Sequence, residues 1–318
     1  MGKTWLMNKV RGMLAEMNLD VCSAAYTGAA ASLIRGAQTI HSAFGIPATS
    51  ASGEADLPAL SATDLASHSQ KFSNVGCVII DEVSMVSTVM LAKISERLCQ
   101  IKGNREPFGG LDVLLVGDFM QLRPVAGTPL YADAVDPGNK GKPTSFKVAG
   151  ATLFSAFQLQ VLKEQVRAAD DQEHSEILES LRDATSKWPV TANVTRYLTK
   201  KILTPQDLQE AAWNEAPVCV TGNQERLNLT PIMAQRFAER RGVPLITWNL
   251  DVRKNSSKLF PENELTPLNS GLVGMFVAGA PAYLTENLNP SLNLANGSRV
   301  TLHSLTFAGH TAEQNEDP

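Results

Sequence analysis

The amino-acid sequence predicts an α/β protein built on a parallel sheet. The stretch from Val75 to Val86 begins with a short, β-branched apolar run, which is typical of a strand buried on both faces of such a sheet. A second buried strand is predicted over residues 111–116. The first run ends in Asp81 and Glu82, and two buried carboxylates would be costly without a partner. We therefore expect the pair at the carboxyl end of its strand, where open α/β sheets bind ligands.

Composition limits the classes of function. A chain of 318 residues is long enough for two ordinary domains, and the net charge of −4 gives no broad basic field, so any nucleic-acid contact would depend on a local groove and on stacking. The four cysteines are far apart and read as reduced packing residues, and the five histidines show no zinc-ligand spacing. No segment has membrane-spanning length and no signal peptide precedes the first motif. The sequence predicts a soluble, intracellular protein.

The chain opens on half of a phosphate-binding loop. Gly2-Lys3-Thr4 matches the end of G-x-x-x-x-G-K-[ST], in which the lysine reaches the β and γ phosphates and the hydroxyl ligates Mg²⁺. Apolar residues follow at helical spacing, which predicts a helix that opens at the motif: Leu6, Val10, Met13, Leu14 and Met17. A chance match of three residues is the alternative, and the downstream strand with its acidic end favours phosphate binding.

The next elements are predicted in chain order. A turn and a strand are expected over residues 18–25, followed by small residues at 27–31 and 36–42 that would allow close approach of a nucleic-acid backbone. On the residues alone, a tight helix start is the preferred interpretation of these small residues. Residues 46–73, rich in Ala, Ser, Thr and Pro, predict a surface connection with little regular structure. A helix is expected from Met85 to Leu98.

Both predicted buried strands end in polar motifs that suit a nucleotide-hydrolysing site. Asp81 is a candidate Mg²⁺ ligand, and Glu82 is a candidate for polarising the attacking water. Gln121, in a G-D-x-x-Q motif after the second strand, is the candidate sensor of the terminal phosphate. Ordinary solvated turns are the alternative for both motifs.

The second half of the chain carries weaker signals. Residues 127–150 predict a loop whose lysines, Lys140, Lys142 and Lys147, are expected in solvent rather than on DNA. A helical region is predicted from Val161, with a further helix over residues 204–213. Residues 218–221 are expected to open a second domain, with a helix over residues 224–241.

Together, the motifs resemble those of the Pif-type DNA helicases, the branch of superfamily one that translocates five-prime to three-prime. The resemblance is carried by the initial G-K-T, T-G-A-A-A with G-A-Q-T-I-H-S, V-I-I-D-E-V-S-M, and F-G-G-L-D-V-L-L-V-G-D-F-M-Q-L-R-P-V, which occur in the same order as in that family. It implies a RecA-like P-loop NTPase motor domain, lacking its first strand, over residues 1–160. It further implies a helical connection over 161–215 and a partial second RecA-like domain over 216–318. Because the first half of the phosphate loop and the late motifs of the second motor domain do not occur in the sequence, we expect a helicase truncated at both ends.

The resemblance also implies roles for individual residues. Gly2, Lys3 and Thr4 would bind ATP, with Thr4 and Asp81 holding Mg²⁺, and Glu82, Gln121 and Arg167 would act in hydrolysis, the last as an arginine finger. Thr39 and His41 are the candidate contacts to DNA.

The implied activity is ATP-dependent unwinding of DNA. The expected partners are single-stranded DNA, DNA junctions and ATP, with no membrane and no obligate protein partner. Expected processes are DNA repair, recombination and telomere maintenance, in the nucleus or mitochondrion of a eukaryote and otherwise in the cytoplasm. Two alternatives stay open: an impaired helicase fragment that only binds nucleic acid, and a RecD-like motor subunit of a nuclease complex.

Overall fold

The structure, a computed structural model, describes residues 2–47, 57–132, 145–163, 170–182, 191–249, 273–286, 288–289, 294 and 296–306. The chain divides into two compact units. The first unit comprises Met1–Tyr197 with Leu284–Ser298, and the second comprises Leu198–Tyr283 with Arg299–Pro318. The division at residues 160 and 215 that the sequence suggests stays a prediction.

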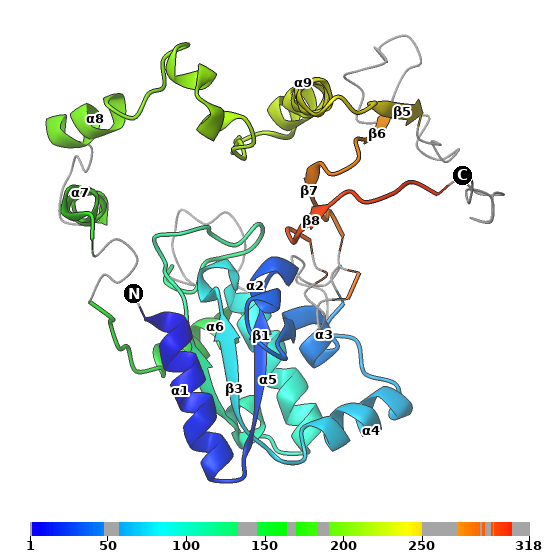
Figure 1. The fold of residues 1–318 in the computed structure, drawn as a ribbon. Coiled ribbons are helices and arrows are strands. Elements are labelled where there is room, and N and C mark those ends of the chain that lie inside the picture. The colour runs from blue at the N-terminus through cyan, green and yellow to red at the C-terminus, as the bar shows by residue number, and fades with distance from the viewer. Residues whose placement is uncertain are drawn as a thin grey trace. The chain divides into compact units, whose positions relative to one another are not determined.

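The first unit is built on a four-stranded parallel sheet, which confirms the predicted fold class (Figure 1). The strand order is β2-β1-β3-β4. The strands are β1 (Asp20–Ala25), β2 (Gln38–Thr39), β3 (Val75–Asp81) and β4 (Asp112–Leu115). The helices of this unit are α1 (Lys3–Glu16), α2 (Gly28–Ser32), α3 (Ile40–Phe44), α4 (Ala62–Lys71), α5 (Thr88–Lys102), α6 (Ser145–Ser155) and α7 (Gln172–Arg182). The helix α8 (Ala192–Thr199) has its first six residues in this unit.

Alternate residues of β3 face two separate hydrophobic cores. Val78 and Ile80 pack with α3 and α5, whereas Cys77 and Ile79 pack with α1 and α2. Successive side chains of a strand point to opposite faces, so an uninterrupted apolar run serves both cores at once. This double burial confirms the prediction for the run that begins at Val75.

The helix predicted after Met85 is α5, and its ends have clear local causes. Ser87 caps the N-terminus by accepting a hydrogen bond from the Met90 N–H at 3.2 Å. Gly103 ends the helix in the left-handed conformation at φ 62°. Gly150 of α6 lies so close to the Thr88 carbonyl that a Cβ at this glycine would overlap it. The two helices can therefore pack at close range.

The prediction of little regular structure over residues 46–73 was wrong for part of that stretch. Residues 62–71 form α4, which Ser61 caps by accepting the Asp64 N–H at 3.1 Å. No α4 residue is buried, so the helix lacks the apolar stripe by which a buried helix is predicted from sequence.

The predicted apolar face of α1 was also partly wrong. The buried residue is Met7, with Val10 and Leu14 packed beside it, while Met13 and Met17 are exposed. The residues that pack on the sheet therefore lie on a somewhat different face of the helix from the predicted residues. Both sets have helical spacing.

Lys147 does not lie in a solvated loop as predicted. It is 7 % exposed and belongs to α6, which begins at Ser145. Its ammonium group is carried on a long aliphatic stem, and such stems pack readily against apolar neighbours. Lys140 and Lys142 lie outside the described residues.

The second unit contains α9 (Asn223–Arg241) and two short antiparallel pairs of strands. These pairs are β5 (Ile246–Asn249) with β6 (Val273–Phe276) and β7 (Pro281–Tyr283) with β8 (Arg299–Thr301). The helix α9 confirms the predicted helix, and the predicted helix over 204–213 appears as two 3₁₀ turns, Asp207–Gln209 and Ala211–Trp213. Residues 218–221, at which the second domain was expected to open, form no strand in the described structure, and Val218 and Val220 are exposed. A β-branched run becomes a strand only where a neighbouring strand pairs with it.

Across the described parts of the chain, no helix combines the length and the apolar character needed to cross a membrane.

Candidate functional site

The carboxyl ends of β3 and β4 lie side by side and bring two polar motifs together. Ile80 is in register with Leu115, and the Val116 N–H donates to the Ile80 carbonyl at 2.8 Å. Three residues after Ile80, the Val83 N–H donates back to the Val116 carbonyl at 3.0 Å. This ladder places Asp81 and Glu82 next to Gly117 and Asp118.

Asp81 and Glu82 leave the strand through a sharp turn. Asp81 is the last residue of β3, and its Oδ1 accepts the Glu82 N–H at 2.9 Å. Glu82 is left-handed, at φ 52° and ψ 44°, which is uncommon for a residue with a side chain. Strained conformations of this kind collect at functional sites. Both carboxylates are half-buried, so both can reach a ligand at this edge.

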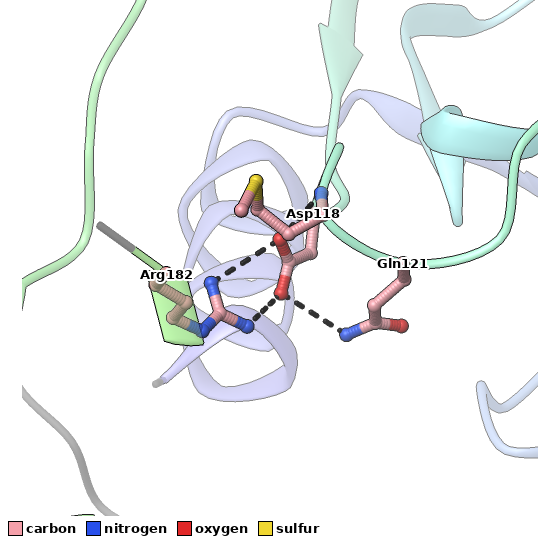
Figure 2. A network of polar contacts seen from close by, with 4 residues as sticks. Asp118, Gln121 and Arg182 are labelled. Carbon is pink, nitrogen blue, oxygen red and sulfur yellow. Dashed lines mark hydrogen bonds and ion pairs between the residues drawn. The ribbon is translucent and has the colours of Figure 1, made fainter. Parts of the chain in front are cut away.

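Asp118 is the centre of a network that the sequence did not predict (Figure 2). Both oxygens of its carboxylate accept hydrogen bonds from Arg182 at the end of α7, with Nη1 at 3.3 Å from Oδ1 and Nη2 closer to Oδ2. Oδ2 also accepts Gln121 Nε2 at 3.1 Å, and Oδ1 accepts the Met120 N–H at 3.1 Å. In Figure 2, Asp118 lies between Arg182 and Gln121.

This network favours the charged form of Asp118. Burial alone would raise the pKa of the Asp118 carboxyl, but the hydrogen bonds and positive charge of Arg182, with the Met120 N–H and Gln121, hold that pKa below its ordinary value. A carboxylate can only accept, so it fixes the Gln121 amide with its nitrogen inward. The second Nε2 hydrogen of Gln121 can then point to a ligand.

The N-terminus of α1 lies at the same edge of the sheet. Leu19, just after α1, packs on Gly76 at the start of β3, whereas Met7 shares a core with Ile79 and Val116 near the ends of β3 and β4. The helix therefore runs opposite to the strands, as Figure 1 shows. Lys3 is four residues before Met7, about 6 Å further along the axis at 1.5 Å per residue. Lys3 and Thr4 thus lie toward the edge that holds Asp81.

The first turn of α1 has properties that suit an anion. Gly2, at its N-cap, makes no side-chain capping hydrogen bond, so the first N–H groups of α1 are not capped in that way. The positive end of the helix dipole and the Lys3 side chain lie together there. Lys3 is half-buried and Thr4 is exposed.

Thr39 and His41 lie on the same edge, two strands away from Asp81. Ala25 of β1 is in register with Thr39 of β2 on one side and with Asp81 on the other. At about 4.8 Å per strand, Thr39 is about 10 Å from Asp81. Thr39 caps α3 by accepting the Ser42 N–H at 3.3 Å, and His41 Nδ1 is 3.0 Å from the Ile46 carbonyl oxygen. Both residues therefore have structural roles, beside which a DNA contact stays a prediction.

The structure brings together most of the predicted site residues but not all of them. Arg167 lies outside the described residues. Asp118 and Arg182 were missed as functional residues; Asp118 is part of the G-D-x-x-Q motif, but no sequence signal links it to Arg182, 64 residues away. In the described part of the chain, no group of three His, Cys, Asp or Glu side chains is placed to hold a metal ion.

Similar proteins were found by family, by sequence and by structure. The family model for PIF1-like helicases matches residues 1–188. The ATP-dependent DNA helicase PIF1 of Danio rerio is 24% identical over 299 residues, covering 94% of this chain and 42% of that protein. The ATP-dependent DNA helicase Pif1 of Psychrobacter sp. is 32% identical over 169 residues, covering 52% of this chain and 23% of that protein. The chain thus spans less than half the length of these relatives.

Solved Pif1 structures share the fold. The crystal structure of Pif1 helicase from Candida albicans matches with a TM-score of 0.55 at 20% identity, covering 94% of this chain and 62% of that chain. Bacteroides Pif1 bound to single-stranded DNA matches with a TM-score of 0.54 at 20% identity, covering 96% and 64%. At this identity the likeness concerns the fold alone. Because the family model covers more than half of its length, the chain belongs to the PIF1-like helicase family.

Proposed function

We propose that the chain carries the ATP-hydrolysing site of an ATP-dependent DNA helicase. The observation that carries the proposal is the meeting of three elements at one edge of the sheet: Asp81 and Glu82 at the end of β3, Gln121 in the loop after β4, and the start of α1 with Gly2 as its N-cap. Family membership and relatives named ATP-dependent DNA helicases support it.

Each residue has a role that its chemistry allows. Lys3 and the first N–H groups of α1 bind the phosphates of ATP, with Gly2 allowing close approach. Glu82 accepts a proton from the attacking water and orients it, and Gln121 donates to the γ-phosphate. Arg167 supplies positive charge to the phosphoryl group in the transition state.

A magnesium ion fits the donors present. Asp81 offers a hard carboxylate oxygen that has no protein partner among the described residues, since only its Oδ1 accepts the Glu82 N–H, and Thr4 offers an exposed hydroxyl. Mg²⁺ is usually held by one or two such groups together with water and phosphate oxygens. When bound, the ion would neutralise charge on the β and γ phosphates.

The proposed partner is single-stranded DNA. A Bacteroides Pif1 was solved with single-stranded DNA and with ADP-AlF3, which supports the same partners for this chain. Thr39 and His41, beside the nucleotide edge, are proposed to contact the DNA backbone. We further propose five-prime to three-prime translocation, action on DNA junctions, and roles in repair, recombination and telomere maintenance, in the nucleus or mitochondrion of a eukaryote and otherwise in the cytoplasm.

Phosphate release from ATP tests the proposal. The 318-residue chain is assayed with malachite green, with Mg²⁺, and with or without single-stranded DNA. We expect release that rises when DNA is added. An Asp81→Asn variant controls for contaminating ATPases, because it removes the proposed metal ligand and should release phosphate only at background level. DNA binding without any phosphate release would identify a nucleic-acid-binding protein instead, and would contradict the proposal.

A further inference from the structure

The pair formed by Asp118 and Arg182 joins two parts of the first unit that are remote in sequence. Arg182 is the last residue of α7, and Asp118 follows β4. The Asp118 side chain is 7% exposed and the Arg182 side chain 36% exposed. A carboxylate this deeply buried needs a cation, and a guanidinium that meets both of its oxygens is the strongest partner that a protein offers.

Arg182 acts on Gln121 through a shared atom. Oδ2 of Asp118 accepts both Arg182 Nη2 and Gln121 Nε2. The Gln121 N–H also donates to the Asp118 carbonyl at 2.9 Å, so the residue is tied to Asp118 by its backbone and by its side chain. Without Arg182, the Asp118 carboxylate must turn to water or take up a proton, and both changes release the Gln121 amide.

The helix that carries Arg182, α7, contributes to a small hydrophobic cluster. Ile177 of α7 packs with Val194 and Tyr197 of α8. His174 Nδ1 lies 2.9 Å from the Tyr197 hydroxyl. The helix α7 therefore packs on α8 through Ile177 and contacts the loop after β4 through Arg182.

We propose that Arg182 is a positioning residue that holds Gln121, through Asp118, in the orientation that senses the γ-phosphate. This inference rests on the proposed function, in which Gln121 donates to that phosphate. Arg182 does not touch the nucleotide. Its removal should therefore lower the affinity for ligands that carry a γ-phosphate and leave the affinity for ADP unchanged.

Binding of two nucleotides separates this role from a purely structural one. Affinities for ADP and for a non-hydrolysable ATP analogue are measured by titration calorimetry with Mg²⁺. Arg182→Ala and Gln121→Ala should each lower the affinity for the analogue about tenfold, as expected for one lost hydrogen bond. The affinity for ADP should be unchanged in both variants. The double variant should lose no more than either single variant, because both changes break one pathway. The affinity of Arg182→Lys for the analogue should lie between those of the parent and Arg182→Ala, since one ammonium group cannot bind both carboxylate oxygens as a guanidinium does.

Arg196→Ala is the matched control, because Arg196 is an exposed arginine of α8 whose bond to Asn193 Oδ1 lies within its own helix. It should behave as the parent chain. Three results would each overturn the proposal. The first is a loss of affinity in the double variant equal to the sum of the two single losses, and the second is nucleotide affinities of Arg182→Ala identical to those of the control. The third is an equal loss of affinity for ADP and for the analogue together with a lower melting temperature.

A second readout needs no nucleotide. Hydrogen exchange of the Met120 and Gln121 amides should be faster in Arg182→Ala than in the parent or in Arg196→Ala, because these amides donate to Asp118. If the parent chain binds ADP and the analogue with equal affinity, Gln121 has no role in sensing the γ-phosphate. The exchange rates of the two amides then test by themselves whether Arg182 positions the loop. Faster exchange confined to the loop supports positioning by Arg182, and unchanged exchange contradicts it.

Discussion

Gly117 lies against Val83 with no room for a side chain. A Cβ at Gly117 would be 2.7 Å from Val83 Cγ1 and 2.8 Å from the Val83 nitrogen. Real Cβ atoms do not approach other atoms this closely, so the contact requires glycine. The turn after β3, which carries Glu82, and the turn after β4, which leads to Gln121, are therefore packed as one piece.

Replacing Gly117 by alanine should disturb both turns. The added methyl group must displace Val83, and overpacking of this kind costs about 1 to 3 kcal/mol of the free energy of unfolding. Urea unfolding followed by circular dichroism measures the loss. Gly12→Ala is the control, because a Cβ there meets nothing within 4 Å in the helix α1, and this change should be stabilising by about 0.5 to 1 kcal/mol. Equal stability of both variants would contradict the packing described.

The contact between Asp118 and Arg182 should show in the pH dependence of stability. Burial alone raises the pKa of the Asp118 carboxyl, yet Arg182, the Met120 N–H and Gln121 bring it below the ordinary value of 3.8. A carboxyl whose pKa is lower in the folded state than in the unfolded state stabilises the fold above the unfolded value, and this contribution is lost as the pH falls through the folded value. The parent chain should therefore be more stable than Arg182→Ala by a constant amount above about pH 5, and by less below about pH 4.

Urea midpoints of the two chains between pH 7 and pH 3.5 measure this difference. An Asp118→Asn chain has no carboxyl at this position, so adding Arg182→Ala to it should give a difference without this acid dependence. A difference between the parent and Arg182→Ala that grows as the pH falls would contradict the ion pair.

Arg97 should be essential for stability although it has no proposed role in the site. Its side chain is fully buried, and its Nη2 donates to the carbonyls of Gly45 at 3.3 Å and Pro58 at 2.7 Å. Burial lowers the pKa of this guanidinium, because it disfavours the charged form. Arg97→Ala leaves both carbonyls without this donor and should lower the free energy of unfolding by about 2 to 4 kcal/mol.

Chemical denaturation tests the role of Arg97, with the exposed Arg196→Ala as control, which should stay within about 0.5 kcal/mol of the parent. Arg97→Met keeps much of the buried stem without the donors. If Arg97→Met were as stable as the parent, the carbonyl contacts would contribute nothing.

Cys22 and Cys77 should resist thiol reagents in the folded chain. Both are buried, and burial raises the pKa of each thiol to about 11, so little reactive thiolate exists near neutral pH. Cys219 is exposed. A short pulse of iodoacetamide at pH 8, followed by mass spectrometry, should modify Cys219 and leave Cys22 and Cys77 unmodified until urea unfolds the chain. Modification of Cys77 at the rate of Cys219 in the folded chain would contradict the position of β3 in the core.

The sequence predicted the parts of the fold that have a strong periodic signal. The buried run at Val75 was found because it is an unbroken, β-branched apolar stretch, and the helix α5 was found because its apolar residues repeat with the helical period. The helix α4 was missed because none of its residues is buried, although Ser61 and Asp64 are a usable start signal.

The site was predictable only where its residues lie in local motifs. Asp81, Glu82 and Gln121 each follow a strand, and parallel strands bring their carboxyl ends together without further information. Arg182 has no such marker, since its partner Asp118 is reached only through the tertiary fold. The left-handed turn at Glu82 was equally beyond prediction, because side-chain-bearing residues rarely adopt it.

The Glu82→Gln variant tests the central claim most directly. Glutamine has nearly the same shape as glutamate but cannot accept a proton from water, while Asp81, Lys3 and the start of α1 are unchanged. Isothermal titration with Mg·ATP and phosphate release with single-stranded DNA are measured on the same preparations of parent and variant. The account predicts that the variant binds Mg·ATP about as well as the parent and has lost DNA-stimulated hydrolysis. Turnover by Glu82→Gln equal to that of the parent would show that this carboxylate does not act on the attacking water.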